Sequence, residues 1–282
     1  MLLRLAPLPH GESWSFEPKW DGFRALAVVD ARTRLLSRRG SDLTRLCPAI
    51  SSLGADLSET VLDGELVAFR DGQPSFEALQ AVMRRGDTAS VAFLAFDLLW
   101  LRGTSLFQEP YQHRREALEA LMLPDPAYVS PRFDDGETLF AQTRDQGYEG
   151  VVAKRRTSVY RCGERSDAWI KAKHWHEGEF VIGGWSPPYR DHGWGLLVGE
   201  ADEEGDLRFR GRVEWGITLT DREELEGTLA PLSSHISPFV DHRERVDDVY
   251  VSPSVSVEIR YLEVTTSGVL RHATFRQIGG RW

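Results

Sequence analysis

The segment Glu17-Pro-Lys-Trp-Asp-Gly-Phe-Arg24 sets one lysine two residues before an Asp-Gly pair and five residues before an arginine. A free lysine has a pKa of about 10.4, so a nucleophilic amine needs nearby cations, burial or a bound metal to favour its neutral form. Gly22 permits the backbone angles of a tight turn, and the guanidinium fork of Arg24 suits ribose or phosphate oxygens. Considered alone, the segment also fits a lysine at a strand edge beside a turn.

Short apolar runs downstream indicate strands, at residues 25–29, 61–69 and 91–100. The run 91–100 is continuously apolar, as is typical of a strand buried on both faces. Ser75 precedes a helical pattern and is placed to cap it. A second helical pattern, at residues 111–123, carries Arg114 and Arg115, which we expect on its polar side.

The segment Asp63-Gly64-Glu65 interrupts the apolar run 61–69. A buried carboxylate is unfavourable without a partner, so Glu65 should either meet a cation inside the fold or point outward at a bulge formed by Asp63 and Gly64. The sequence alone leaves both interpretations open.

In chain order, these segments resemble the motifs of the covalent nucleotidyltransferases, which comprise DNA ligases, RNA ligases and mRNA capping enzymes. The matching stretches are K-x-D-G-x-R from Lys19, S-R-x-G from Ser37, D-G-E from Asp63, F-D-L-L from Phe96, E-G-x-x-x-K from Glu149 and R-S-x-x-W-x-K-x-K from Arg165. The last stretch, together with S-F-x-x-L-Q from Ser75, is similar to DNA ligases in particular, and the small bacterial ATP-dependent ligases of the end-joining type are the nearest resemblance. An RNA ligase or a GTP-using capping enzyme is the alternative within this superfamily.

The resemblance implies an α+β fold with two domains. Residues 1–175 would form a nucleotidyltransferase (adenylation) domain of antiparallel sheets with flanking helices, and residues 176–282 a small all-β OB-fold barrel. Short strands with turn signals between them, at residues 180–184, 195–199, 207–213 and 255–264, agree with a barrel. A hinge is expected near residues 174–178.

The resemblance also implies roles for individual residues. Lys19 would attack ATP and carry AMP, and Lys171 and Lys173, two apart on a strand and therefore on one face, would neutralise phosphate charge. Two unrelated exposed lysines are the alternative. The implied nucleotide contacts are Glu17 at the adenine amino group, Phe96 against the base, Arg24, Arg38, Glu65 and Lys154 elsewhere, and Arg271 at the leaving pyrophosphate. Glu65 and Glu149 would hold Mg²⁺ or Mn²⁺.

Two departures from the family pattern stand out. Cys162 replaces the usual proline, and the chain stops at Gln-Ile-Gly-Gly-Arg-Trp282 where relatives continue into a further basic motif. The second departure keeps open a different class of protein, a binding module that holds nucleic-acid ends without catalysis.

The expected partner is nicked double-stranded DNA. Because the net charge is −9, loose binding to a polyanion is unfavourable, and DNA contact requires local basic faces. The residues assigned to it are Arg38, Arg39, Arg165, Arg208, Arg210 and Arg212. Strand alternation puts Arg208, Arg210 and Arg212 on one face of a strand. The alternative to DNA contact is that these arginines only keep an edge strand soluble.

The remaining expectations concern the setting. No apolar run approaches the roughly 20 residues that span a bilayer, and two cysteines suit a reducing, cytoplasmic location. We expect a monomer, with end-joining or repair proteins as further partners.

Overall fold

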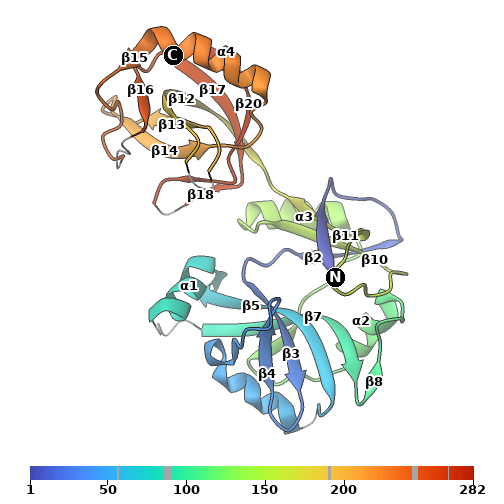
Figure 1. Ribbon diagram of the computed structural model, residues 1–282. Coiled ribbons are helices and arrows are strands. Elements are labelled where there is room, and N and C mark those ends of the chain that lie inside the picture. The colour runs from blue at the N-terminus through green and yellow to red at the C-terminus, as the bar shows by residue number, and fades with distance from the viewer. Residues whose placement is uncertain (56, 86–89, 190–191, 243–246, 266) are drawn as a thin grey trace. The chain divides into compact units, whose positions relative to one another are not determined.

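The structure is a computed structural model that describes residues 1–55, 57–85, 90–189, 192–242, 247–265 and 267–282 (Figure 1). It divides into two compact units, Met1–His174 and Trp175–Trp282. The boundary lies one residue before the predicted one, between residues 175 and 176. Each unit has its own apolar core and is described separately.

The first sheet of the first unit is antiparallel except for its parallel edge pair β1–β11. In spatial order its strands are β1 (Leu2–Leu5), β11 (Arg165–Lys173), β10 (Gly150–Arg155) and β2 (Trp14–Pro18). Helix α3 (Gly136–Asp145) covers one face, where Leu139 packs with Phe16 and Val151 (Figure 1).

The second sheet of this unit is larger and includes the longest apolar strands. Its main path is β4 (Arg34–Ser37), β3 (Phe23–Val29), β5 (Thr60–Arg70), β7 (Ser90–Leu101) and β8 (Thr104–Ser105); β6 (Gln73–Pro74) pairs with β5, and β9 (Ala127–Val129) pairs with β7. Helices α1 (Phe76–Arg85) and α2 (Tyr111–Glu119) flank it, with 3-10 turns η1 (Thr44–Leu46) and η2 (Pro48–Ala55). Ser75 caps α1 as predicted, since its Oγ accepts a hydrogen bond of 3.1 Å from the Ala78 amide.

The two sheets of the first unit pack face to face through one cluster of apolar side chains. Trp169 of β11 meets Leu26 of β3, Val61 of β5 and Leu99 of β7 there. Residues 19–22 connect β2 in the first sheet to β3 in the second. The lysine segment is therefore the crossover between the sheets, at the margin of the space that they enclose.

The second unit is built around β12 (His176–Ser186), which pairs with three other strands. The other elements are β13 (Gly195–Ala201), β14 (Leu207–Val213), α4 (Leu219–Leu229), η3 (Ala230–Leu232), β15 (Ser233–Ser234), β16 (Val249–Val251), β17 (Val255–Tyr261), β18 (Glu263–Val264), β19 (Leu270–Arg271) and β20 (Thr274–Arg281). A bridge between Trp215, after β14, and Thr274, in β20, brings the two ends of the sheet together around the core.

We expected the second unit to contain strands only. This detail was wrong, because the unit also contains helix α4. Leu225 and Leu229 of this helix are buried in the core of the unit. Thr218 and Asp221 form a capping box at its start, and Thr-x-x-Asp is the sequence signal that would have revealed the helix.

Within the described part of the chain, none of the helices has the length and apolar character needed to span a membrane.

Candidate active site

Lys19 lies at the end of β2 and is held there by the neighbouring strand. Its amide donates a hydrogen bond of 2.9 Å to the Gly150 carbonyl, and its Nζ pairs with Oε2 of Glu149. The other oxygen of the same carboxylate, Oε1, lies 2.7 Å from Nζ of Lys173. One half-buried carboxylate thus bridges two ammonium groups.

Two glycines allow the strands to approach closely enough for this arrangement. A β-carbon on Gly150 would lie 2.1 Å from the carbonyl oxygen of Ala172, and the Gly150 φ of +149° also disfavours other residues. A β-carbon on Gly22 would lie 2.1 Å from the carbonyl oxygen of Leu66 and 2.9 Å from Cγ of Glu65. Since φ of Gly22 is not positive, the expected reason for this glycine was wrong, and close packing against β5 is the reason instead.

Lys171 joins the same group of cations. Burial, followed by the charges of Lys173 and Lys19, lowers the pKa of Lys171. The structure therefore brings Lys19, Lys171 and Lys173 around Glu149, and a surplus of positive charge in a partly enclosed space favours an anion. Lys154 lies in the same region of the unit, so all four lysines among the 34 lysine and arginine residues of the chain gather here.

Glu65 lies opposite Arg24 in the pairing of β3 with β5. Burial raises the pKa of Glu65 to about 8, although the charges of Lys19 and Arg24 oppose the rise. Within the described residues, no hydrogen bond or ion pair reaches this carboxylate. Mg²⁺ prefers oxygen ligands and needs only one or two carboxylates when waters and substrate phosphates complete its shell. Glu65 and Glu149, both influenced by the charge of Lys19, fit such an ion.

A cavity of about 200 Å³ opens between the two sheets beside Lys19. Its lining comes from both sheets and includes Leu3, Glu17, Pro18, Lys19, Trp20, Arg24, Glu65, Phe96, Val152, Lys154 and Trp169. Three aromatic side chains and several charged groups therefore line one space, as in many ligand sites.

Arg24 lines the cavity but is largely committed to the protein. Its guanidinium forms a two-pronged pair with the fully buried Asp63, at 3.0 and 2.6 Å, and also contacts Tyr160 Oη at 3.2 Å. Asp63 and Tyr160 were not predicted as partners of Arg24. The signal was available, because Asp63 is a second carboxylate in the same apolar strand as Glu65.

Glu17 is buried at the back of the cavity in a polar cluster. Its Oε1 accepts a hydrogen bond of 2.6 Å from the Tyr111 hydroxyl and lies 2.7 Å from Nζ of Lys154. Lys154 also donates to the Phe96 carbonyl at 2.9 Å, and its Nζ lies 4.4 Å from the ring centroid of Phe96 and 4.5 Å from that of Trp169. Burial lowers the pKa of Lys154, against the opposing charge of Glu17.

The expected polar position of Arg114 and Arg115 on α2 was wrong, since both side chains are buried. Arg114 pairs with Asp97 through two contacts of 2.8 Å, and both side chains are fully buried. Arg115 approaches Glu17 to 3.7 Å. Helical periodicity marks these arginines as polar, but it cannot show that acids from other strands face them.

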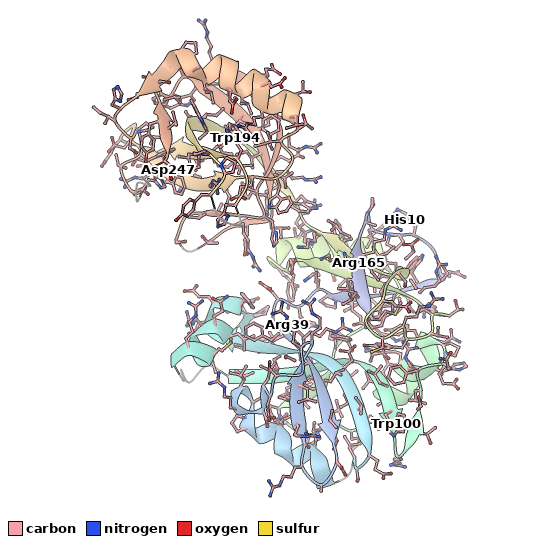
Figure 2. All side chains as sticks on the ribbon, in the orientation of Figure 1. His10, Arg39, Trp100, Arg165, Trp194 and Asp247 are labelled. Atoms are coloured by element: carbon pink, nitrogen blue, oxygen red, sulfur yellow. The ribbon has the colours of Figure 1, made fainter. Side chains whose placement is uncertain are left out.

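Three of the arginines assigned to DNA lie on the surface of the first unit. Arg38 and Arg39 are exposed just after β4, and Arg165 is exposed at the start of β11. Figure 2 shows Arg39 and Arg165 at these two places. The charge of Arg165 is one of those that lower the pKa of Lys171, so this arginine is electrostatically linked to the lysines around Glu149.

The arginines of β14 each have an acidic neighbour. Arg208 pairs with Asp202 at 2.7 Å, Arg210 with Glu200 at 3.0 Å, and Arg212 with Glu214 at 2.7 Å. The pairing of β13 with β14 also shifts register, because Gly199 faces Phe209 while Val198 faces Gly211. Strict alternation therefore does not continue unbroken from Arg208 to Arg212.

Arg271, expected at the pyrophosphate, lies in β19 of the second unit and pairs with Glu263 at 2.7 Å. Its position is described only within that unit.

Comparisons with known proteins agree with this arrangement. Residues 8–173 match the family described as ATP dependent DNA ligase domain, and residues 191–279 match the ATP dependent DNA ligase C terminal region. The chain is 41% identical over 273 residues to the multifunctional non-homologous end joining DNA repair protein LigD of Mycobacterium tuberculosis, which covers 93% of this chain and 36% of that protein.

Solved structures give the same result. The crystal structure of the ligase domain of M. tuberculosis LigD is 39% identical, with a TM-score of 0.56, and the match covers 98% of this chain and 95% of that one. A mycobacterial DNA ligase D complexed with ATP and MES is 40% identical, with a TM-score of 0.56 and the same coverage. The first unit is a nucleotidyltransferase domain and the second an OB-fold domain, as predicted, and the chain belongs to the ATP-dependent DNA ligase family.

Proposed function

We propose that this chain seals nicks between a 5′-phosphate and a 3′-hydroxyl in DNA at the expense of ATP. The observation that carries the proposal is the bridging of Lys19 and Lys173 by Glu149 beside a cavity between two sheets. A nucleophilic amine, a carboxylate and a surplus of cations in one partly enclosed site suit transfer of a phosphorus group.

The similarity to mycobacterial ligases supports this chemistry and, through the name of LigD, a role in end joining. The chain spans 36% of the length of that relative. The repair role, partners among end-joining proteins, a monomeric state and a cytoplasmic setting are accordingly parts of the proposal.

The cavity would receive the adenine and part of the ribose. Its volume of about 200 Å³ is below the roughly 300–1,000 Å³ of complete ligand pockets, so the phosphates would extend past Lys19 toward Lys171 and Lys173. Phe96 and Trp169 would contact the base, and a stacked base contributes about 1–3 kcal/mol. Because Arg24 is already paired with Asp63, its main role would be to fix the side chains that line the cavity, and its contact with phosphate would be minor.

The reaction would proceed by two-stage transfer of AMP followed by sealing. Lys19 Nζ attacks the α-phosphorus of ATP, the bond to pyrophosphate breaks, and a lysyl-AMP phosphoramidate forms. Glu149, in contact with Nζ, is placed to accept the proton that the amine loses. The 5′-phosphate of the nick then displaces Lys19 from AMP, and the 3′-hydroxyl attacks the resulting DNA-adenylate and releases AMP.

Mg²⁺ or Mn²⁺ would be held by Glu65 and Glu149 and would polarise phosphate oxygens as a Lewis acid. Lys171 and Lys173 supply fixed positive charge toward the same oxygens. Arg38, Arg39, Arg165, Arg208, Arg210 and Arg212 would contact DNA phosphates, and Arg271 the pyrophosphate.

The decisive experiment compares the wild type with Lys19→Ala and Lys19→Arg. Incubation with [α-³²P]ATP should label the wild type and neither variant, because arginine keeps the charge beside Glu149 but lacks a usable amine. Both variants should still seal a pre-adenylylated nick. Label on Lys19→Ala, or preferential labelling by GTP or sealing of RNA nicks by the wild type, would contradict the proposal.

A further inference from the structure

Two residues of helix α2, Tyr111 and Arg115, contact Glu17, which lines the cavity. The Tyr111 hydroxyl donates to Glu17 at 2.6 Å, Nζ of Lys154 lies 2.7 Å from it and Nη1 of Arg115 lies 3.7 Å from it. In each of these contacts the nearest atom of the carboxylate is Oε1. The other oxygen, Oε2, is thereby left to a ligand in the cavity that Glu17 lines.

Tyr111 is fixed in this position by the backbone of the first unit. Its amide donates to the Ser158 carbonyl at 2.8 Å, and the next amide, of Gln112, donates to the Arg156 carbonyl at 2.9 Å. Burial, and then the charge of Glu17, raise the pKa of Tyr111 well above its usual value. The phenol therefore remains a hydrogen-bond donor in the range of pH at which proteins work.

Arg115 stands behind Glu17 and is also held rigidly. Its Nε donates to Glu119 at 2.8 Å and its Nη2 to the Ser130 carbonyl. Its Nη1 is buried and, among the described residues, has no hydrogen-bond partner. An arginine in this position adds positive charge beside the carboxylate, and the loss of Tyr111 or of Arg115 would leave Glu17 Oε1 with fewer contacts to fix its orientation.

We infer that Tyr111, supported by Arg115, is a positioning residue that presents Glu17 Oε2 as a fixed acceptor and so makes the cavity select a purine with an amino group at C6. Adenine offers that N–H donor, whereas guanine offers an acceptor oxygen at the same place, which a carboxylate repels. The inference rests on the proposed function, since it concerns the base of the same ATP.

The test measures the rate of lysyl-nucleotide formation with two substrates, ATP and the triphosphate of purine riboside, which lacks the amino group. Wild type should prefer ATP. In Tyr111→Phe that preference should fall by about tenfold, the scale of one hydrogen bond to a charged group, through slower reaction with ATP and little change with the analogue. The far-ultraviolet circular dichroism spectrum of Tyr111→Phe should match that of the wild type, which reports folding.

Tyr160→Phe is the matched control. Tyr160 is a buried tyrosine of the same unit whose hydroxyl donates to Asp63 at 2.8 Å, so its loss should affect both triphosphates alike. Arg115→Lys provides a second variant, with the same expected fall in preference, should Tyr111→Phe fail to fold.

The outcomes separate the two proposals. Normal wild-type labelling with an unchanged preference in Tyr111→Phe and Arg115→Lys would overturn the positioning role alone. No adduct on the wild type with ATP would overturn the proposed function and this inference together.

Discussion

Gly22 packs so tightly against Leu66 that a β-carbon on the glycine would lie 2.1 Å from the leucine carbonyl oxygen. Gly22 belongs to the crossover that carries Lys19, and Leu66 follows Glu65 in β5. The contact between Gly22 and Leu66 therefore sets the distance between the Lys19 amine and the Glu65 carboxylate.

We predict that Gly22→Ala slows formation of the AMP adduct by about 100-fold, the scale expected for a misplacement of about 1 Å. Labelling with [α-³²P]ATP in single-turnover conditions measures the rate. Gly227→Ala is the matched control, because nothing lies within 4 Å of a β-carbon there, and it should label at the wild-type rate. Equal rates for both variants would show that the contact with Leu66 is not needed.

A second prediction concerns metal. Glu65→Gln removes a carboxylate charge that would bind a cation. The Mg²⁺ concentration for half-maximal labelling should therefore rise at least about tenfold, because the loss of a residue that only supports a metal ligand already lowers metal affinity by about that factor. Removal of Mg²⁺ with EDTA should stop labelling of the wild type. Glu77→Gln, at the exposed start of α1, should need no more Mg²⁺ than the wild type, and an equal demand in Glu65→Gln would exclude Glu65 as a ligand.

A third prediction concerns stability. Asp97→Asn leaves Arg114 buried without its counter-charge, since both side chains of this pair are fully buried, and should lower the free energy of unfolding by about 3–5 kcal/mol. Urea denaturation measures the change. Glu226→Gln breaks the half-exposed pair with Arg222 and should cost no more than about 0.5 kcal/mol. If both variants lost a similar free energy of unfolding, burial of the ion pair would not determine how much its loss destabilises the protein.

A fourth prediction concerns the acidic partners on β13 and β14. Glu200→Gln releases Arg210 from its pair, so nicked DNA should bind more tightly at low salt and with a salt dependence steeper by about one unit of log–log slope. Glu224→Gln makes the same charge change on the exposed side of α4. If both variants shift binding equally, net charge accounts for the effect and Arg210 does not contact phosphate.

Local patterns predicted the parts of the site that depend on neighbouring residues. Strand alternation correctly indicated that Lys171 and Lys173 lie near one another, and Ser75 was identified as a cap from the residues that follow it. The chemical neighbours of Lys19 came from the resemblance to known motifs. No rule of spacing alone brings Glu149 to a lysine 130 residues away.

Contacts between distant strands explain what the sequence could not supply. Arg114 is buried because Asp97 faces it from β7. The roles of Tyr111 and Arg115 on α2 depend on Glu17, which lies in β2 of the first sheet. The register shift at Arg210, between the paired residues Phe209 and Gly211, interrupts the alternation that the sequence of β14 predicts.

The gathering of all four lysines around the cavity has a practical consequence for handling this protein. Arginine supplies every other permanently cationic side chain, so reagents that acylate or cross-link side-chain amines have targets only at the place where ATP would bind. Dyes, biotin esters and amine-coupled sensor surfaces would therefore react at that place or at the α-amino group of Met1, and attachment through the exposed Cys162 is the safer route.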